Sequence, residues 1–349
     1  MNSSTKTMCG VLLTGHGGPE KLEFRSDIPM PQPGPRDVLI RITAAGVNNT
    51  DINTRTAWYS KKEAADDDAT WSGEPLQFPR IQGIDACGEI MAAGREVHKS
   101  RIGERVIVEP CIREAGGKRL PIPWFLGSEC DGGFAEYLVV ASSHAYAIAS
   151  SLSDVELASF PCSYSTAENM LTRAAVKEGE RVLITGASGG VGSAAVQLAK
   201  ARGATVIAVT TPSKAADLLK LGADQVVYRD ESLIEALGTN STDVVLDLVA
   251  GKQWNELLDL LHPGGRYAVA GAIGGPLVEL DVRTLYLKDL TLFGCTVLEP
   301  EVFSNLVMRI ENGQVSPLVA MTRPLEQIAE AQAAFQEKKH VGKIVLTVA

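Results

Sequence analysis

A glycine-rich segment in the second half of the chain has the residue types and spacing of a phosphate-binding turn. The apolar run 181–185 leads directly into GASGGVG at 186–192, and a helix-like segment follows. Counted from Ala187, the spacing is A-x-G-x-x-G, in which Gly189 lets the backbone approach a pyrophosphate and Gly192 lets a helix pack closely on a strand. Strand, turn and helix occur in the order that a dinucleotide site requires. The predicted contacts are Gly186, Ala187, Gly189, Gly190, Val191 and Gly192.

The end of the next strand favours NADP(H) over NAD(H). An NAD site normally has an Asp or Glu about twenty residues after the glycine turn, where it binds the ribose hydroxyls. Here the run TVIAVT at 205–210 ends without an acid, and TPSK follows at 211–214. Hydroxyl groups and a cation can bind a 2′-phosphate through charge-assisted hydrogen bonds. The residues in question are Thr210, Thr211, Ser213 and Lys214, although a lysine here is also typical of a solvated helix start.

A sheet and its helices must position these segments, and the pattern of the chain changes near Ser150. Before this point, short β-like runs are separated by Gly and Pro, as in an all-β domain. After it, helices alternate with apolar strands, which is typical of a doubly wound parallel sheet. We therefore predict an α/β protein, with a β-rich domain at 1–150 and 295–349 and a parallel-sheet domain at 151–294.

Composition limits the class of protein. The chain has 349 residues, 45% of them hydrophobic, and no apolar run approaches the roughly 20 residues that span a bilayer. The net charge of −9 argues against a nucleic acid partner, because such binding needs clustered Lys and Arg. Six scattered cysteines without a C-x-x-C pair predict reduced thiols, and residues 1–10 do not resemble a secretory signal. We expect a cytoplasmic protein with a small-molecule substrate and neither a nucleic acid nor a membrane partner.

A polar segment at 60–77 interrupts the first domain. It includes three consecutive aspartates at 66–68 and has no hydrophobic periodicity. Its acids and small residues can bury little apolar area. Two interpretations remain open, a lid over the substrate site and a disordered surface insertion.

Five segments resemble the medium-chain dehydrogenase/reductase superfamily, specifically its zinc-free quinone oxidoreductase and enoyl reductase branch. They are AAGVNNTDINTR (44–55), DGGFAEY (131–137), GASGGVGSAAVQLAK (186–200), LGAD (221–224) and VGKIVL (341–346). They occur in the family's order over nearly the whole chain. The resemblance implies a GroES-like catalytic domain, a Rossmann domain, a cleft between the two and a homodimer.

The resemblance also implies further cofactor contacts. Ser213, Lys214 and Tyr228 match the group around the 2′-phosphate in NADPH-dependent members, and Thr166 resembles a residue near the nicotinamide. Later contacts are implied at Ala270, Gly271, Ala272, Gly294, Cys295 and Lys343. A purely structural role remains the alternative for each of these later positions.

The family's zinc-ligand positions argue against a catalytic metal in this chain. Zinc-dependent members have Cys and His at the positions that resemble Asn48 and Ile84, and only Cys162 resembles the remaining ligand. One thiolate cannot hold a catalytic zinc, which needs three protein ligands. The four closely spaced cysteines of the family's structural zinc lobe are also missing. We predict no metal, the alternative being an unusual site built from Cys111, Cys130, His144 or an acid.

Without a metal, hydrogen-bond donors must stabilise the charge that develops on the substrate oxygen. Asn48 carries an amide donor, and Tyr59 follows it at a spacing similar to the active-site tyrosine of enoyl thioester reductases. The resemblance thus predicts that Tyr59 donates a proton to the substrate α-carbon or binds its oxygen. The alternatives are that Asn48 is a turn residue and that Tyr59 packs beside Trp58.

These observations lead to one leading hypothesis and two alternatives. The leading hypothesis is an NADPH-dependent oxidoreductase that transfers hydride to a quinone or an α,β-unsaturated carbonyl. The first alternative is a relative of the zinc-type alcohol dehydrogenases that acts on an alcohol or aldehyde. The second is a non-catalytic NADPH-binding protein, because a fold alone does not guarantee activity.

Overall fold

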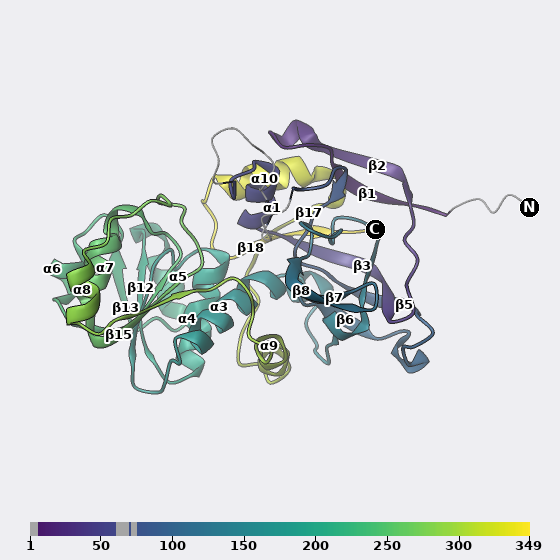
Figure 1. Cartoon of the computed structure of the whole chain (residues 1–349). Helices are drawn as coiled ribbons and strands as arrows, with labels where there is room; N and C mark the ends of the chain where they lie inside the picture. The colour runs from purple at the N-terminus through teal and green to yellow at the C-terminus, as the bar shows by residue number, and fades with distance from the viewer. Residues whose placement is uncertain (1–5, 61–69, 71–74) are drawn as a thin grey trace, which may run out of the picture. The chain divides into compact units, whose positions relative to one another are not determined.

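A computed structural model of the chain describes residues 6–60, 70 and 75–349. It divides into two compact units, one made of Met1–Cys162 and Pro317–Ala349 and the other of Ser163–Ser316. Figure 1 shows the elements of each unit. Most of the polar segment 60–77 lies outside the described residues, so its interpretation as a lid or an insertion stays open.

The unit formed by 163–316 is built on a six-stranded sheet in which every pairing is parallel. Its strand order is β13-β12-β11-β14-β15-β16, so the chain order reverses between β11 and β14. Ligands of open α/β sheets bind at the carboxyl ends of the strands at such a reversal. The strands are β11 (Arg181–Ile184), β12 (Thr205–Thr210), β13 (Gln225–Tyr228), β14 (Thr242–Asp247), β15 (Leu261–Val269) and β16 (Thr291–Gly294).

Helices cover both faces of this sheet. In Figure 1, α6, α7 and α8 lie together on one face, and α3 and α4 lie on the other. Apolar side chains from the strands and from α7 form a core in which Leu183, Val245 and Tyr267 are fully buried. No helix in the described part of the chain has the length and apolar character needed to cross a bilayer. The helices are α3 (Pro161–Arg173), α4 (Gly190–Ala201), α5 (Ala215–Lys220), α6 (Leu233–Leu237), α7 (Trp254–Leu260), α8 (Val282–Leu287) and α9 (Val302–Glu311).

The other unit is rich in antiparallel β-structure. Its largest sheet has the order β10-β6-β5-β3-β18-β17, with β9 also paired to β3, and smaller sheets have the orders β2-β1-β4 and β7-β8. The end of the chain joins this unit because β18 pairs with β3, with Ile344 opposite Val47. The elements are β1 (Thr7–Leu13), β2 (Leu22–Pro29), β3 (Asp37–Val47), α1 (Asn49–Arg55), β4 (Arg80–Ile81), β5 (Cys87–Ala93), β6 (Arg105–Val108), β7 (Cys111–Ala115), β8 (Lys118–Phe125), β9 (Tyr137–Ala141), β10 (Ala145–Ala147), α2 (Asp154–Leu157), β17 (Val319–Pro324), α10 (Ile328–Gln336) and β18 (Lys343–Thr347).

The units divide later in the sequence than the pattern predicted. The sequence placed the boundaries after residues 150 and 294, whereas the structure divides after 162 and 316. At the first boundary, α2 packs on β3, β5 and β18. At the second, the Asn169 side chain donates to the Val297 carbonyl at 3.2 Å, and Arg173 pairs with Glu299 at 2.9 Å. These long-range contacts leave no local sequence signal.

Candidate active site

The glycine turn between β11 and α4 is tightly packed. Gly186 has a φ of 56°, a left-handed conformation that favours glycine. Gly189 precedes the helix with extended backbone angles. A Cβ on Gly192 would lie 2.3 Å from the Gly186 carbonyl oxygen and 2.6 Å from Cα of Ala187. The turn thus brings the start of α4 against the end of β11, which leaves the first amides of the helix available for a phosphate.

Asp247 stabilises the loop next to this turn through hydrogen bonds. No sequence motif predicted this residue. This fully buried residue ends β14, beside β11. Its carboxylate accepts hydrogen bonds from the hydroxyls of Thr185 and Tyr267. It also accepts from the backbone N–H groups of Val249 at 2.9 Å and Ala250 at 3.1 Å. This network fixes the two loops at the point where the strand order reverses, so the cofactor surface is preorganised.

A second group of predicted residues gathers where β12 and β13 end. Thr210 lies opposite Tyr228 in the parallel register, and the backbone N–H of Arg229 donates to the Thr210 carbonyl at 2.9 Å. Burial lowers the pKa of Lys214, and the positive charge of Arg229 lowers it further. No sequence motif pointed to Arg229, the first residue after β13. The predicted residues in this group are Thr210, Thr211, Ser213, Lys214 and Tyr228.

The later cofactor positions follow β15 and β16 in the same unit. A Cβ on Gly271 would lie 2.7 Å from the Leu248 carbonyl oxygen, so close packing alone can explain why this position is a glycine. Cys295 is buried, and burial raises the pKa of its thiol to about 11. Its backbone N–H donates to the Val269 carbonyl at 2.9 Å. The cofactor contacts at Thr166, Ala270, Gly271, Ala272, Gly294 and Cys295 stay predictions.

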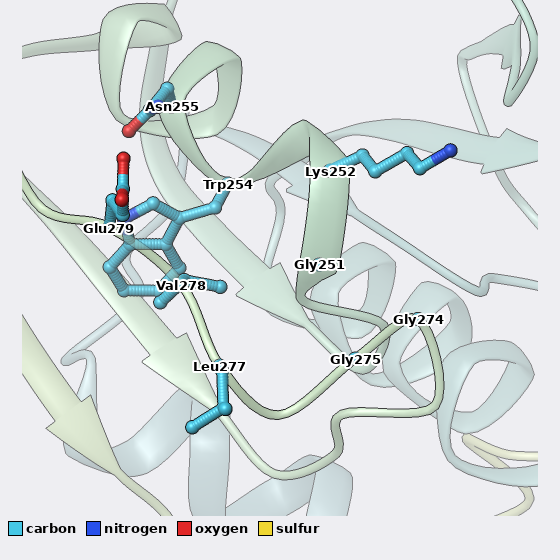
Figure 2. Close-up of a pocket in the computed structure, with 9 residues that line it drawn as sticks. All are labelled: Gly251, Lys252, Trp254, Asn255, Gly274, Gly275, Leu277, Val278 and Glu279. Atoms are coloured by element: carbon cyan, nitrogen blue, oxygen red, sulfur yellow. The ribbon is translucent and has the colours of Figure 1, made fainter.

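A small pocket lies in this unit but contains none of the predicted site residues. It has a volume of about 320 Å³ and is formed by the segments that follow β14 and β15. Figure 2 shows Trp254, Asn255 and Glu279 among its lining residues. The indole nitrogen of Trp254 is buried and has no hydrogen-bond partner among the described residues. The pocket lacks the glycine turn, so we do not assign the cofactor to it.

The β-rich unit contains a buried cluster of Asn48, Asp85 and Lys343. The ammonium of Lys343 lies 2.8 Å from Oδ2 of Asp85, and the two side chains are 2% and 0% exposed. The same ammonium donates to the amide oxygen of Asn48. The amide nitrogen of Asn48 donates to Asp85 at 2.7 Å and to the Gly46 carbonyl at 3.3 Å.

This cluster bears on two predictions from the sequence. Both amide hydrogens of Asn48 have protein acceptors, so donation to a substrate requires one of these hydrogen bonds to break. Lys343 was predicted at the cofactor, and its ammonium is instead held in a buried ion pair. The catalytic role of Asn48 and the cofactor contact of Lys343 stay predictions, and the geometry favours a positioning role for both.

Asp51 lies next to the cluster at the start of α1. Its carboxylate accepts from the backbone N–H of Asn48 at 2.8 Å and from that of Ile84 at 3.2 Å. Burial raises the pKa of Asp51 to about 7, the charge of Asp85 adds to the increase, and the two backbone hydrogen bonds and Lys343 oppose it. Asp51 therefore changes charge near neutral pH while it holds the first turn of α1.

The raised pKa of Asp51 predicts a pH-dependent contribution to stability. The folded state binds a proton between the unfolded pKa of 3.8 and the folded pKa of about 7, so unfolding becomes easier as pH rises through this window. Relative to Asp51→Asn, the wild type is expected to lose roughly 2 to 3 kcal/mol of unfolding free energy between pH 5 and pH 8. Urea unfolding of both proteins across this range measures the difference. Parallel pH profiles for the two proteins would contradict the assignment.

Tyr59 is partly buried and contacts polar side chains of α1. Its hydroxyl donates to Oγ1 of Thr50 at 3.1 Å and accepts from the amide of Asn53 at 3.3 Å. The ring of Trp58 meets the Tyr59 ring edge to face, with 5.4 Å between centroids. Burial raises the pKa of Tyr59 to about 12, so the hydroxyl keeps its proton at neutral pH. The helix thus orients a protonated phenol, but its one O–H hydrogen has Thr50 as acceptor, so donation to a substrate requires this hydrogen bond to break.

Comparisons with known proteins agree with this architecture. Residues 34–150 match the family model of the alcohol dehydrogenase GroES-like domain, and residues 190–312 match that of zinc-binding dehydrogenases. Human quinone oxidoreductase is 31% identical over 360 residues, and the alignment covers 99% of each chain. The chain belongs to the medium-chain dehydrogenase/reductase superfamily, in its quinone oxidoreductase branch. The predicted family and the predicted combination of a GroES-like and a Rossmann domain are confirmed.

Two further relatives carry different names. Acryloyl-coenzyme A reductase from Sulfurisphaera tokodaii is 28% identical, with 94% of this chain and 97% of the relative covered. A solved structure of a "putative alcohol dehydrogenase" from Sinorhizobium meliloti 1021 is 46% identical, has a TM-score of 0.92 and covers 100% of this chain and 99% of that one. Membership of the family shows that this protein is an oxidoreductase of the medium-chain type. The different names of its relatives do not identify the electron acceptor.

The zinc of zinc-dependent superfamily members does not fit the residues present here. The three relevant positions offer an amide held by protein partners, the apolar side chain of Ile84 and a single thiol at Cys162. The Asp85 carboxylate beside Asn48 is already paired with the Lys343 ammonium at 2.8 Å. No group of three His, Cys, Asp or Glu suited to a metal exists among the described residues. These donors do not supply the three protein ligands of a catalytic zinc.

Proposed function

We propose that this protein is an NADPH-dependent reductase that transfers hydride to a quinone or an α,β-unsaturated carbonyl without a catalytic metal. The buried Lys343–Asp85–Asn48 cluster carries this proposal, because Asn48, at a position that resembles a zinc ligand of zinc-dependent members, is held in a hydrogen-bonded ion pair that offers a metal neither a thiolate nor an imidazole. The hydroxyls and Lys214 after β12, with no acid at its end, support NADPH. Relatives named quinone oxidoreductase and acryloyl-coenzyme A reductase support the acceptor class.

The protein's own groups must orient the acceptor and supply a proton. NADPH, held at the glycine turn, would supply hydride for the β-carbon of an enone or enoyl thioester. Tyr59 exchanges its hydrogen bond to Thr50 for one to the carbonyl oxygen, or donates this proton to the α-carbon, while the Asn53 amide continues to donate to its oxygen. An enolate carbon is basic enough to take a proton from a phenol of this pKa. Solvent then returns a proton to Tyr59, so the reaction consumes one hydride and one proton per acceptor.

The proposal is tested by cofactor consumption with metal-stripped protein. Quinones, enones and enoyl thioesters are offered in separate reactions with NADPH, and NADH is used in parallel. We expect turnover with NADPH in the absence of added metal. Tight NADPH binding without turnover on any acceptor would support the non-catalytic alternative. Activity that appears only after zinc is restored would overturn the metal-free proposal.

Replacement of Tyr59 by Phe is expected to reduce kcat by roughly 100-fold or more, because a positioned proton donor contributes about that much. The ring and its contact with Trp58 are retained, so binding of NADPH should not change, and the loss of the hydrogen bonds to Thr50 and Asn53 should lower stability only by about 1 to 2 kcal/mol. Steady-state kinetics on the best acceptor from the panel measure the effect. Tyr146→Phe is a matched control, since Tyr146 is a half-buried tyrosine on β10 of the same unit. Full activity of Tyr59→Phe on every acceptor would rule out its catalytic role.

A second candidate is oxidation or reduction of an alcohol–aldehyde pair. It is favoured by the alcohol dehydrogenase name of the 46% identical solved structure. Elemental analysis of the purified protein and assays with simple alcohols and aldehydes test it. Stoichiometric zinc together with alcohol turnover would favour this candidate over the reductase.

We also propose a homodimer, formed through β16 and α8. Strand β16 is an edge of the six-stranded sheet, and an exposed edge normally needs a cover. Large apolar side chains gather on the segment 273–287, with Leu277 at 92%, Leu287 at 71% and Ile273 at 64% exposure. An isologous contact brings the same edge strand and apolar segment of two copies together, so each copy covers the other's patch.

Replacement of Leu287 by Asp is expected to dissociate this dimer, because each interface would then bury two unpaired carboxylates. Light scattering of wild type and variant at micromolar concentration gives the mass of each species. Leu219→Asp is the control, since Leu219 is 49% exposed on α5, outside the 273–287 segment. A wild-type monomer, or a dimer that survives Leu287→Asp unchanged, would contradict the proposed interface.

A further inference from the structure

Two residues with positively charged side chains follow the carboxyl ends of β12 and β13. Lys214 follows β12 in the short turn Pro212–Lys214, and Arg229 is the first residue after β13. The two strands are in register where they end, and the Arg229 backbone N–H donates to the Thr210 carbonyl at 2.9 Å. The sheet itself therefore fixes the backbone of Arg229 beside the loop that carries Lys214.

The neighbouring acids do little to neutralise Arg229. Asp230 lies 3.7 Å from the guanidinium, and the two side chains are 83% and 65% exposed, so this pair contributes little. Glu231 accepts a hydrogen bond from the backbone N–H of Tyr228 at 3.3 Å. Burial is the first cause that lowers the pKa of Lys214, and the charge of Arg229 is the second. A dianion between the two cations would remove this repulsion.

A buried hydroxyl at the carboxyl end of β12 is an independent sign of a ligand. Thr210 is 5% exposed, and its Oγ1 has no hydrogen-bond partner among the described residues. A buried hydroxyl without a partner is costly unless a ligand or water satisfies it. Beside it, the hydroxyls of Thr211 and Ser213 lie 3.2 Å apart. The carboxyl ends of β12 and β13 thus combine hydroxyl donors with two positively charged residues.

We propose that Arg229 is a specificity-determining residue that binds the 2′-phosphate of NADPH together with Lys214. This inference rests on the proposed NADPH dependence and adds a residue to it. A guanidinium presents planar paired donors that match phosphate oxygens, whereas Lys214 acts as a point charge. NADH lacks the 2′-phosphate and cannot make this contact, so Arg229 favours NADPH.

The test uses two probes that differ only in the phosphate of interest, 2′,5′-ADP and 5′-AMP, with binding measured by calorimetry on the whole protein. Arg229→Gln is expected to weaken 2′,5′-ADP roughly 10- to 100-fold, the value of a hydrogen bond to a charged group, and to leave 5′-AMP unchanged. Arg229→Lys should give an intermediate loss because it keeps the charge without the paired donors. Arg95→Gln is the matched control, since Arg95 is 81% exposed and lies 3.8 Å from the neighbouring Glu96.

The outcomes separate this inference from the proposed function. A wild-type protein that binds both probes equally would overturn the NADPH preference itself. A wild type that prefers 2′,5′-ADP, with the preference lost in Lys214→Gln but kept in Arg229→Gln, would overturn only the role of Arg229. Equal weakening of both probes in Arg229→Gln would indicate damage to the adenosine site, and it would also contradict a specific phosphate contact.

Discussion

Lys343→Met is expected to lower the free energy of unfolding by about 3 to 5 kcal/mol, the largest stability effect of any single substitution considered. The substitution removes the ammonium and leaves Asp85 buried with one hydrogen-bond donor fewer. Asp85 is fully buried, so water cannot replace the lost partner without opening the unit. The ammonium also bonds to Asn48, whose amide oxygen would lose its partner too. Chemical denaturation of wild type and variant measures the effect.

The chain contains a matched control for this substitution. Lys339 pairs with Glu337 at 2.9 Å, but the two side chains are 82% and 56% exposed. Lys339→Met should change stability by less than about 1 kcal/mol, because exposed ion pairs contribute little. The double variant Lys343→Met with Asp85→Asn removes both charges and should recover part of the loss. Equal effects for the two single lysine variants would mean that the buried ion pair has no special role.

The local features of this protein could be predicted from its sequence. The glycine turn could be identified because strand, glycines and helix lie within about twenty consecutive residues and the spacing itself reports the geometry. The β-rich and parallel-sheet regions could be distinguished for the same reason, since alternating helices and strands leave a periodic pattern. Ser213 and Lys214 were found because the end of β12 lies at a known distance from the turn.

The long-range features could not be predicted in this way. Asp85 and Lys343 are 258 positions apart, and they meet because β18 and β5, which follows Asp85, both pair with β3 in the folded sheet. Arg229 carries no local signal beyond its place after a strand, and its relation to Lys214 depends on the register of β12 and β13. Asp247 is similar, since its partner Thr185 follows a different strand, β11. Side chains of this kind need a topology before their chemistry can be inferred.

Gly192→Ala and Gly189→Ala are expected to separate two roles of the glycine turn. A Cβ on Gly192 would lie 2.3 Å from the Gly186 carbonyl oxygen, so the backbone must move, at a cost of about 1 to 3 kcal/mol. That movement also displaces the amides that would hold the pyrophosphate, so NADPH affinity should fall together with stability. A Cβ on Gly189 would lie 3.4 Å from the same oxygen, which is an ordinary contact.

Gly189→Ala should therefore keep the wild-type stability. It still places a methyl group where the proposed pyrophosphate approaches the backbone, so only NADPH affinity should fall. Thermal unfolding gives the melting temperature of each variant, and a binding titration gives its Kd for NADPH. The expected result is a loss of both quantities in Gly192→Ala and of affinity alone in Gly189→Ala. If Gly189→Ala bound NADPH as tightly as the wild type, the pyrophosphate would not contact this glycine, and the cofactor site would have to lie elsewhere on the sheet.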